Sequence, residues 1–113
     1  MKTVTIGVSS LEELDERMKG AFEGRYQGSR ISFISMALMW KILTPKRWEI
    51  IRAMTGAGPL AIREVARRVN RDVKAVHGDV TALITAGLIN KTETGKVEFP
   101  YDRVHVDFEI KAA

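Results

Sequence analysis

The sequence predicts a small α+β protein, because helical and strand-like patterns of apolar residues occur together in one short chain. Between residues 45 and 86, apolar side chains return every three or four positions, which is the spacing of helices with one buried side. Apolar and polar residues alternate in Thr3–Val8 and in Arg103–Ile110, as is typical of half-buried strands. With 113 residues and 45% hydrophobic content, the chain can bury one core.

The first thirty residues predict a strand, Thr3–Val8, followed by an acidic amphipathic helix, Leu11–Phe22. Phosphates would repel the acidic turns of this helix, so we expect it to pack on the domain's own core or on a second subunit. The polar, glycine-containing stretch Glu23–Arg30 is expected to be a loop. It divides the chain into an N-terminal arm or dimerisation element, residues 1–30, and a main domain, residues 31–113.

Residues 31–54 predict a short strand, Ile31–Ile34, and two helices. Ser35 is a suitable N-cap for a helix Met36–Leu43, whose apolar residues lie all round it. That pattern predicts burial, in the core or in a dimer interface. The next helix, Pro45–Met54, follows an N-cap threonine and has proline at its first position. The basic side chains expected on its outer side or rim are Lys46, Arg47 and Arg52.

The next stretch predicts two helices joined by a tight turn. The first, Leu60–Val69, has one buried stripe, and the turn Asn70-Arg71-Asp72 ends on a residue suited to be an N-cap. The second runs over Val73–Ala86 and is followed by Gly87, a residue type that commonly ends helices. Its inner face is expected to carry Val73, Val76, Val80, Leu83 and Ile84. This is the form of a helix-turn-helix.

After Gly87 the pattern changes to two short strands, Leu88–Glu93 and Lys96–Phe99, around a Thr94-Gly95 turn. A two-stranded ribbon behind the second helix is a wing. The order of elements therefore predicts a winged helix-turn-helix with an N-terminal strand-helix extension. The last strand, Arg103–Ile110, could pair with Thr3–Val8 or with Ile31–Ile34, in the same chain or in a partner's, and the sequence leaves this open.

Positive charge is concentrated in one part of the chain. The formal net charge is +4, and residues 41–77 carry nine Lys or Arg against three Asp or Glu. Residues 1–40 are neutral overall and residues 78–113 are slightly acidic. The excess thus lies in and just before the helix-turn-helix, as expected of a phosphate-binding face. The alternative explanation is a basic, solvated helix surface.

Several short pieces of the same region also resemble a known family, and the resemblance covers about Phe33–Val106. The most specific pieces are Leu43-Thr44-Pro45-Lys46-Arg47, Arg71-Asp72-Val73, Val76-His77, Asp79-Val80 and Pro100-Tyr101-Asp102. They are similar to small prokaryotic predicted transcriptional regulators with a winged helix of the MarR/ArsR-like type. The resemblance implies a sequence-specific regulator, as a rule a repressor, that binds double-stranded DNA as a homodimer. Some members are encoded beside toxin genes, so it also allows an autoregulating antitoxin with a cognate toxin as partner.

The residues expected to contact DNA lie on the second helix, the helix before it, the turn and the wing. The N-terminal part of a recognition helix usually meets base edges, so Lys74, His77 and Thr81 are the candidate base readers. The candidate phosphate contacts are Arg67, Arg68, Arg71, Lys91 and Lys96. Gly78 either allows the helix to approach DNA closely or is a tolerated glycine at an exposed site. Asp79 is expected to pair with a basic side chain nearby.

The sequence contains no motif typical of an enzyme, a metal-binding protein or a membrane protein. It has no phosphate-cradling glycine loop with a lysine, no metal-ligand pair and no nucleophile beside a base, so we expect no enzymatic activity, no cofactor and no metal. No apolar run approaches the roughly 20 residues that span a bilayer, and the lack of cysteine fits a reducing compartment, so we expect a cytoplasmic protein. The alternative function is a winged-helix protein–protein interaction module that does not bind DNA.

Overall fold

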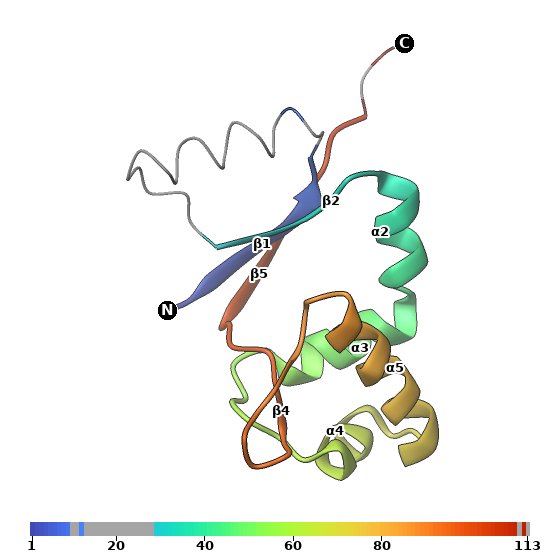
Figure 1. Cartoon of the computed structure of the whole chain (residues 1–113), viewed down its shortest axis with the longest axis vertical. Helices are drawn as coiled ribbons and strands as arrows, with labels where there is room; N and C mark the ends of the chain where they lie inside the picture. The colour runs from blue at the N-terminus through green and yellow to red at the C-terminus, as the bar shows by residue number, and fades with distance from the viewer. Residues whose placement is uncertain (10–11, 13–28, 111, 113) are drawn as a thin grey trace.

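A computed structural model of the chain describes residues 1–9, 12, 29–110 and 112. It is an α+β protein with a small sheet at one end and three helices with a two-stranded ribbon at the other (Figure 1). Apart from Glu12, the helix expected over residues 11–22 lies outside the described residues, and so does most of the loop expected over residues 23–30. No helix in the described part is long and apolar enough to cross a membrane.

The sheet has three parallel strands in the order β2-β1-β5. The strands are β1 (Thr3–Val8), β2 (Arg30–Phe33) and β5 (Arg103–Asp107). The last strand thus pairs with the first one of the same chain, which settles the pairing that the sequence left open. β1, which belongs to the predicted N-terminal arm, lies between β2 and β5 and hydrogen-bonds with both.

The apolar positions of β1 face the core. Val4 and Ile6 are fully buried, and Ile6 has Ile31 and Val106 beside it in the neighbouring strands. The strand prediction for β1 is confirmed at both ends. The predicted bounds of its neighbours were partly wrong. β2 begins at Arg30, one residue before the predicted start, and β5 ends at Asp107 rather than at Ile110.

Gly7 is the point where β1 and β5 leave no room for a side chain. A Cβ atom built on Gly7 would lie 2.1 Å from the carbonyl oxygen of Asp107 and 2.8 Å from Nη2 of Arg30. The first of these atoms belongs to the backbone of the neighbouring strand, so it cannot turn aside as a side chain can. Glycine at this position is therefore required by the pairing of the two strands.

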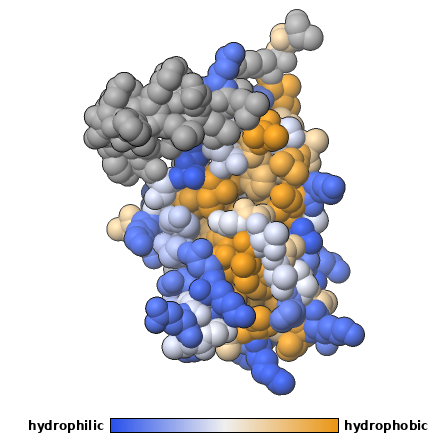
Figure 2. Space-filling model, in the orientation of Figure 1, coloured by the Kyte–Doolittle hydropathy of each residue, from blue (hydrophilic) through white to orange (hydrophobic). Residues whose placement is uncertain are grey.

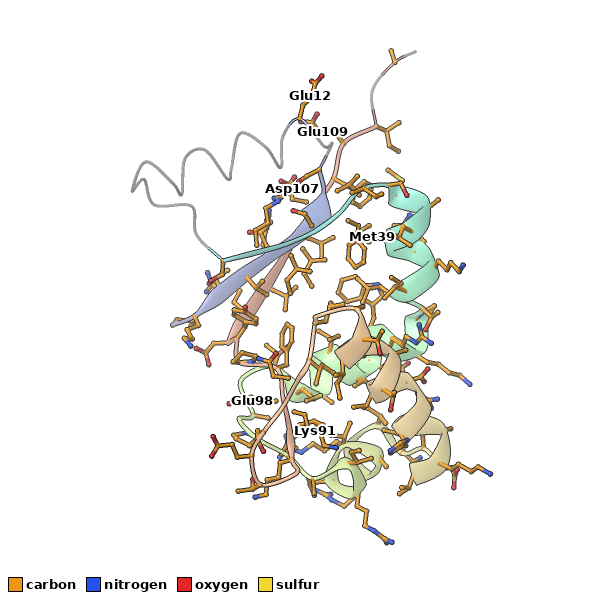
Figure 3. All side chains as sticks on the ribbon, in the orientation of Figure 1. Glu12, Met39, Lys91, Glu98, Asp107 and Glu109 are labelled. Atoms are coloured by element: carbon orange, nitrogen blue, oxygen red, sulfur yellow. The ribbon has the colours of Figure 1, made fainter. Side chains whose placement is uncertain are left out.

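Helix α2 (Met36–Ile42) leads from the sheet to the other helices. Ser35 caps it as predicted, since its Oγ accepts a hydrogen bond of 3.1 Å from the amide of Leu38. Met39 is fully buried between α2 and the sheet, but 47% of Trp40 is exposed (Figure 3). Within one chain, α2 is therefore buried on one side only, and burial of its other side in a dimer interface stays a prediction.

Helices α3 (Pro45–Met54), α4 (Ile62–Val69) and α5 (Val73–Thr85) pack together around the second part of the core. Their fully buried apolar residues are Ile50, Ile51, Met54, Val65, Val76, Val80 and Leu83. The predicted start of α3 is confirmed: Thr44 caps it, with Pro45 at the first position. The prediction that Val73 faces inward was wrong, because it occupies the first position of α5, at the surface, and is 39% exposed.

The turns around α5 also follow the sequence. Asn70 adopts the left-handed conformation with φ 54°, which lets the chain reverse between α4 and α5. Gly87 has φ 84° just after the end of α5, as predicted for a glycine that ends a helix. Both residues thus set the direction in which the chain enters and leaves α5.

The ribbon consists of β3 (Asn90–Lys91) and β4 (Val97–Glu98), which pair antiparallel and are shorter than predicted. Leu60 joins them as a third, single-residue bridge, because its amide and carbonyl each form a 2.8 Å hydrogen bond with Val97. Leu60 was predicted to begin a helix; instead α4 begins at Ile62, since the backbone of Leu60 is bonded to the ribbon. The segment before α4 and the ribbon are therefore one unit.

Candidate functional site

One side of α5 is a polar, exposed face. Lys74, His77, Gly78 and Thr81 are all exposed there, on the side away from the buried valines of the same helix. The structure thus brings the three candidate base readers and Gly78 together on one surface, as the sequence predicted. We call these four residues the α5 face.

The start of α5 is occupied by its own cap. The carboxylate of Asp72 accepts hydrogen bonds from the amide of Lys74, at 3.1 Å, and from the amide of Ala75, at 3.3 Å. These are the amides that would otherwise attract an anion to the start of a helix. These two amides are therefore not free to bind an anion, and the side chains of Lys74, His77 and Thr81 are the exposed polar groups that the α5 face offers.

Asp79, the only acidic residue within α5, points into the protein and is held by two arginines. Its Oδ1 lies 3.0 Å from Nε of Arg47 on α3, and its Oδ2 lies 2.9 Å from Nη2 of Arg71 in the turn before α5. Burial raises the pKa of the Asp79 carboxyl, but the hydrogen bonds from Arg71 and Arg47 outweigh it, so this pKa lies below its ordinary value. The prediction that Asp79 pairs with a basic side chain is confirmed.

The two arginines fix α5 to the rest of the helical part. Arg47 also donates a 2.9 Å hydrogen bond to the carbonyl of Ile42, so it joins the end of α2, α3 and α5. Of the two positions expected for Arg47, outward or at the rim, the structure fits the rim, because 23% of its side chain is exposed. Arg71, predicted to contact phosphate, is turned inward, with 17% of its side chain exposed. In the structure both arginines hold α5 in place.

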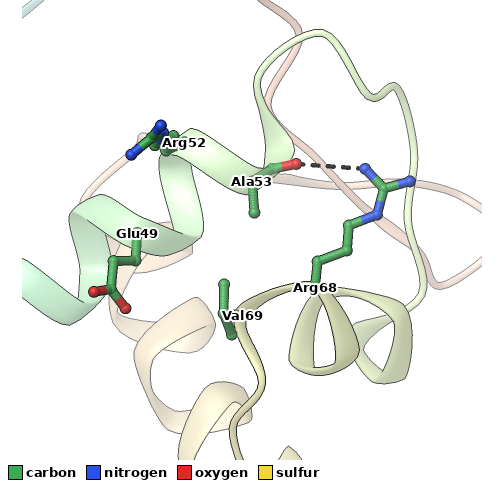
Figure 4. A pocket seen from close by; sticks show the side chains of 5 residues that line it. All are labelled: Glu49, Arg52, Ala53, Arg68 and Val69. Atoms are coloured by element: carbon green, nitrogen blue, oxygen red, sulfur yellow. Dashed lines mark hydrogen bonds between the residues drawn. The ribbon is translucent and has the colours of Figure 1, made fainter.

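The other two predicted arginines, Arg67 and Arg68, lie on α4 and share Glu64. Arg67 hydrogen-bonds the carboxylate of Glu64, which lowers the pKa of that carboxyl, and 72% of its side chain is exposed. Arg68 reaches over α3, where its Nη1 donates to the carbonyl of Ala53 at 3.5 Å (Figure 4). It lines an open groove of about 450 Å³ between α3 and α4 together with Glu49, Arg52, Ala53 and Val69. Arg67 is thus the more exposed of the two, whereas Arg68, with 38% of its side chain exposed, extends toward α3.

The two lysines predicted for the wing, Lys91 and Lys96, are exposed on the ribbon, an element separate from α5 (Figure 3). Thr92 shapes the turn between them, since its Oγ1 accepts a 3.1 Å hydrogen bond from the amide of Lys96. Gly95 adopts φ 81° in the same turn, as predicted. Within the described residues, no three His, Cys, Asp or Glu side chains gather as they would around a metal ion.

Comparison of the sequence with models of known protein families gives a match. The model of the HVO_A0114 family matches residues 42–106, which is more than half of the chain. The chain belongs to the HVO_A0114 family. No curated protein matches it. The HVO_A0114 match contains α3, α4, α5 and the ribbon complete, together with all nine predicted contact residues, whereas β1 and β2 lie outside it.

One residue of this HVO_A0114 region that matters for the α5 face was not among the predicted site residues. Arg47 carries one of the two hydrogen bonds that turn Asp79 away from the surface. The sequence signal was present, because Asp79 is the lone acid on a helix whose other polar residues lie outward. To predict that its partner is Arg47, one must know that α3 packs on α5, and the periodicity of the sequence does not reveal that packing.

Gly78→Ala should raise the free energy of unfolding by about 1 kcal/mol, because glycine is a poor former of helix interiors. Nothing lies within 4 Å of a Cβ atom at this position, so the added methyl group meets no clash. Urea denaturation measures the change, and Ala75→Gly at another exposed position of α5 should shift it in the opposite direction. A loss of stability in Gly78→Ala would contradict the open space at this site.

Proposed function

We propose that α3, α4, α5 and the ribbon form a winged helix-turn-helix that binds double-stranded DNA with the α5 face in the major groove and so regulates transcription. The observation that carries this proposal is the composition of the α5 face. It presents Lys74 and His77, while the only acid within the helix is turned inward and paired with two arginines. The carboxylate nearest to this face, that of the N-cap Asp72, is hydrogen-bonded to the amides of Lys74 and Ala75. A cationic helix surface of this kind favours the approach of an anionic backbone.

The arrangement of elements supports the same proposal. The three-residue connection between α4 and α5 reverses the chain at Asn70, and the ribbon directly follows α5. Leu60 bonds the ribbon to the segment before α4, so the ribbon is attached to the helices at both of its ends. A winged helix has this order of helices and strands. The second helix of its helix-turn-helix contacts the bases, and the ribbon lies beside that helix.

The exposure of the predicted residues suggests different roles for them in DNA binding. We assign base reading to Lys74, His77 and Thr81, whose side chains are exposed on one side of α5. Phosphate contact is assigned to Arg67, Lys91 and Lys96, which are exposed outside that face. Arg68 and Arg71 become positioning residues, because one extends toward α3 and the other holds Asp79.

Selection of bound duplexes from a random pool with purified protein tests this function directly. Enrichment of one sequence, with affinity that falls as salt rises, is the expected result, since each neutralised phosphate contributes about 0.9 to the log–log salt slope. No retention on any duplex at low salt would contradict DNA binding. It would leave the protein–protein interaction module as the explanation of the same surface.

Lys74→Ala should weaken binding to the selected duplex about tenfold more than binding to a random duplex, because base contacts discriminate and phosphate contacts do not. His77→Ala should have the same selective effect. Arg67→Ala is the matched control, since it removes an exposed cation from α4 and should weaken both complexes alike. Fluorescence anisotropy with the two duplexes measures all of these constants. Equal losses on both duplexes for all three variants would remove α5 as the base reader.

A further inference from the structure

We propose that two copies of the chain associate through β5, with the two strands antiparallel about a two-fold axis at Val106. The two sheets would then join edge to edge into one continuous sheet. This proposal does not rest on DNA binding, and all of its tests are made without DNA. It is carried by three features of β5 and the residues after it: an open edge, a partly uncovered apolar side and an order of charges that is complementary to itself.

The first feature is the open edge. Within the described residues, β5 pairs with β1 on one side and forms the edge of the sheet on the other. The backbone amides and carbonyls along such an edge are ready to pair with another strand. Many proteins block their edge strands with charges, so the arrangement of the charges decides whether this edge repels or accepts a copy of itself.

The second feature is the apolar side of the strand. Val106 is 40% exposed and Phe108 39%, although both lie on the side of the sheet that is packed against the helices. Trp40 of α2 meets Phe108 edge to face, with ring centres 5.9 Å apart, and remains half exposed. Figure 2 shows hydrophobic surface between the sheet and α2 on this face of the molecule. These three side chains form an apolar strip along the open edge, which a second copy would cover.

The third feature is the order of charges. The polar positions of the segment are basic first, Arg103 and His105, and then acidic, Asp107 and Glu109. Figure 3 shows Asp107 at the end of β5 and Glu109 just beyond it. When such a strand pairs antiparallel with its copy, the basic half of one meets the acidic half of the other. The edge is therefore complementary to itself, which a row of like charges would not be.

One register pairs apolar residues with each other on one side of the strand and opposite charges on the other side. With the two-fold axis at Val106, this residue meets its own copy and Val104 meets Phe108 of the second copy, so the apolar positions are paired. In the same register Arg103 faces Glu109 and His105 faces Asp107 of the second copy. A shift by one position toward the C-terminus would place Asp107 opposite itself, and a shift the other way would do the same to His105. Asp107 can take a further partner, because its contact with Arg30 is 3.6 Å long and 54% of its side chain is exposed.

A charge exchange tests the pairing. Arg103→Glu places like charges together twice in the proposed dimer and should raise the dimer dissociation constant on the order of tenfold or more. Adding Glu109→Arg restores opposite charges with the signs exchanged, so the double variant should dimerise like the wild type. Arg63→Glu, the same change on exposed α4, is the matched control and should have no effect. Sedimentation equilibrium gives the constants, and circular dichroism verifies that each variant is folded.

Single cysteines test the register, since the chain has no cysteine of its own. Val106→Cys should form a disulfide-linked dimer under mild oxidation, because the two sulfurs would meet on the axis. Val73→Cys, at a position equally exposed but on α5, should stay monomeric on a non-reducing gel. A wild-type monomer at a concentration of a hundred micromolar would overturn the proposal. So would a dimer that neither Arg103→Glu weakens nor Val106→Cys links, because it would use another surface.

Discussion

Asp79→Asn should lower the free energy of unfolding by about 2–3 kcal/mol, which corresponds to a fall in Tm of roughly 10 °C. The substitution keeps the shape of the side chain but removes the charge that two partly buried arginines share. Arg47 and Arg71 would then face each other across a neutral amide in a partly buried site. Because they also hold α5 against α3, the DNA binding that we propose should weaken along with stability, equally on selected and random duplexes.

The same carboxylate predicts a pH dependence with a definite sign. The pKa of Asp79 is lower in the folded protein than in the unfolded chain, so its stabilising contribution is complete above the unfolded pKa of about 3.9. It is lost as the pH falls through the folded pKa. The difference in unfolding free energy between wild type and Asp79→Asn should therefore stay constant from pH 7 to about pH 5 and shrink below about pH 4. Urea titrations across this range measure it.

Glu64→Gln is the matched control for Asp79→Asn. Glu64 also pairs with two arginines and also has a lowered pKa, but its partner Arg67 is largely exposed on the surface of α4. Water screens exposed pairs, so we expect little change in stability from this variant. A loss as large as that of Asp79→Asn would show that burial of the Asp79 site is not the cause of its contribution.

Gly7→Ala should destabilise the protein by about 3 kcal/mol, because the new methyl group would overlap the carbonyl oxygen of Asp107 on the next strand. The contact can be relieved only if β1 and β5 separate, which would expose part of the core around Val4 and Ile6. Thermal unfolding followed by circular dichroism measures the loss.

Two substitutions serve as controls for Gly7→Ala. Thr5→Ala changes the neighbouring polar position of β1 without adding volume, so it should cost much less than Gly7→Ala. Gly78→Ala makes the identical chemical change on α5 and should have the opposite sign, since the space around Gly78 is open. If Gly7→Ala were as well tolerated as Gly78→Ala, the close approach of β1 to β5 would be refuted.

Much of the fold was predictable because helix ends are set by local chemistry. Ser35, the Thr44-Pro45 pair and Asp72 each satisfy backbone groups within three or four residues, and the helices begin where these residues place them. The α5 face followed from periodicity alone, since the four residues that form it share one side of any regular helix.

The remaining features depend on contacts between distant parts of the chain. Neither the pairing of β5 with β1 nor the bridge from Leu60 to Val97 has a local signal, because parallel strands and single bridges are chosen by packing. The inward turn of Arg71 was missed for the same reason, since a basic residue next to a helix start reads equally well as a surface cation. Tertiary pairing thus decided which of the predicted arginines remained at the surface.

The place of β1 in the middle of the sheet has a consequence for the order in which the protein folds. Thr3 pairs with Arg103, a hundred positions later, so β1 leaves the ribosome long before its neighbour exists. At about 5–20 residues per second, the delay is on the order of ten seconds. During that time the apolar side of β1 has no β5 to complete its sheet, whereas α3, α4 and α5 can already pack on one another. A chain interrupted before β5 would keep that strand edge open, and with it a site for aggregation.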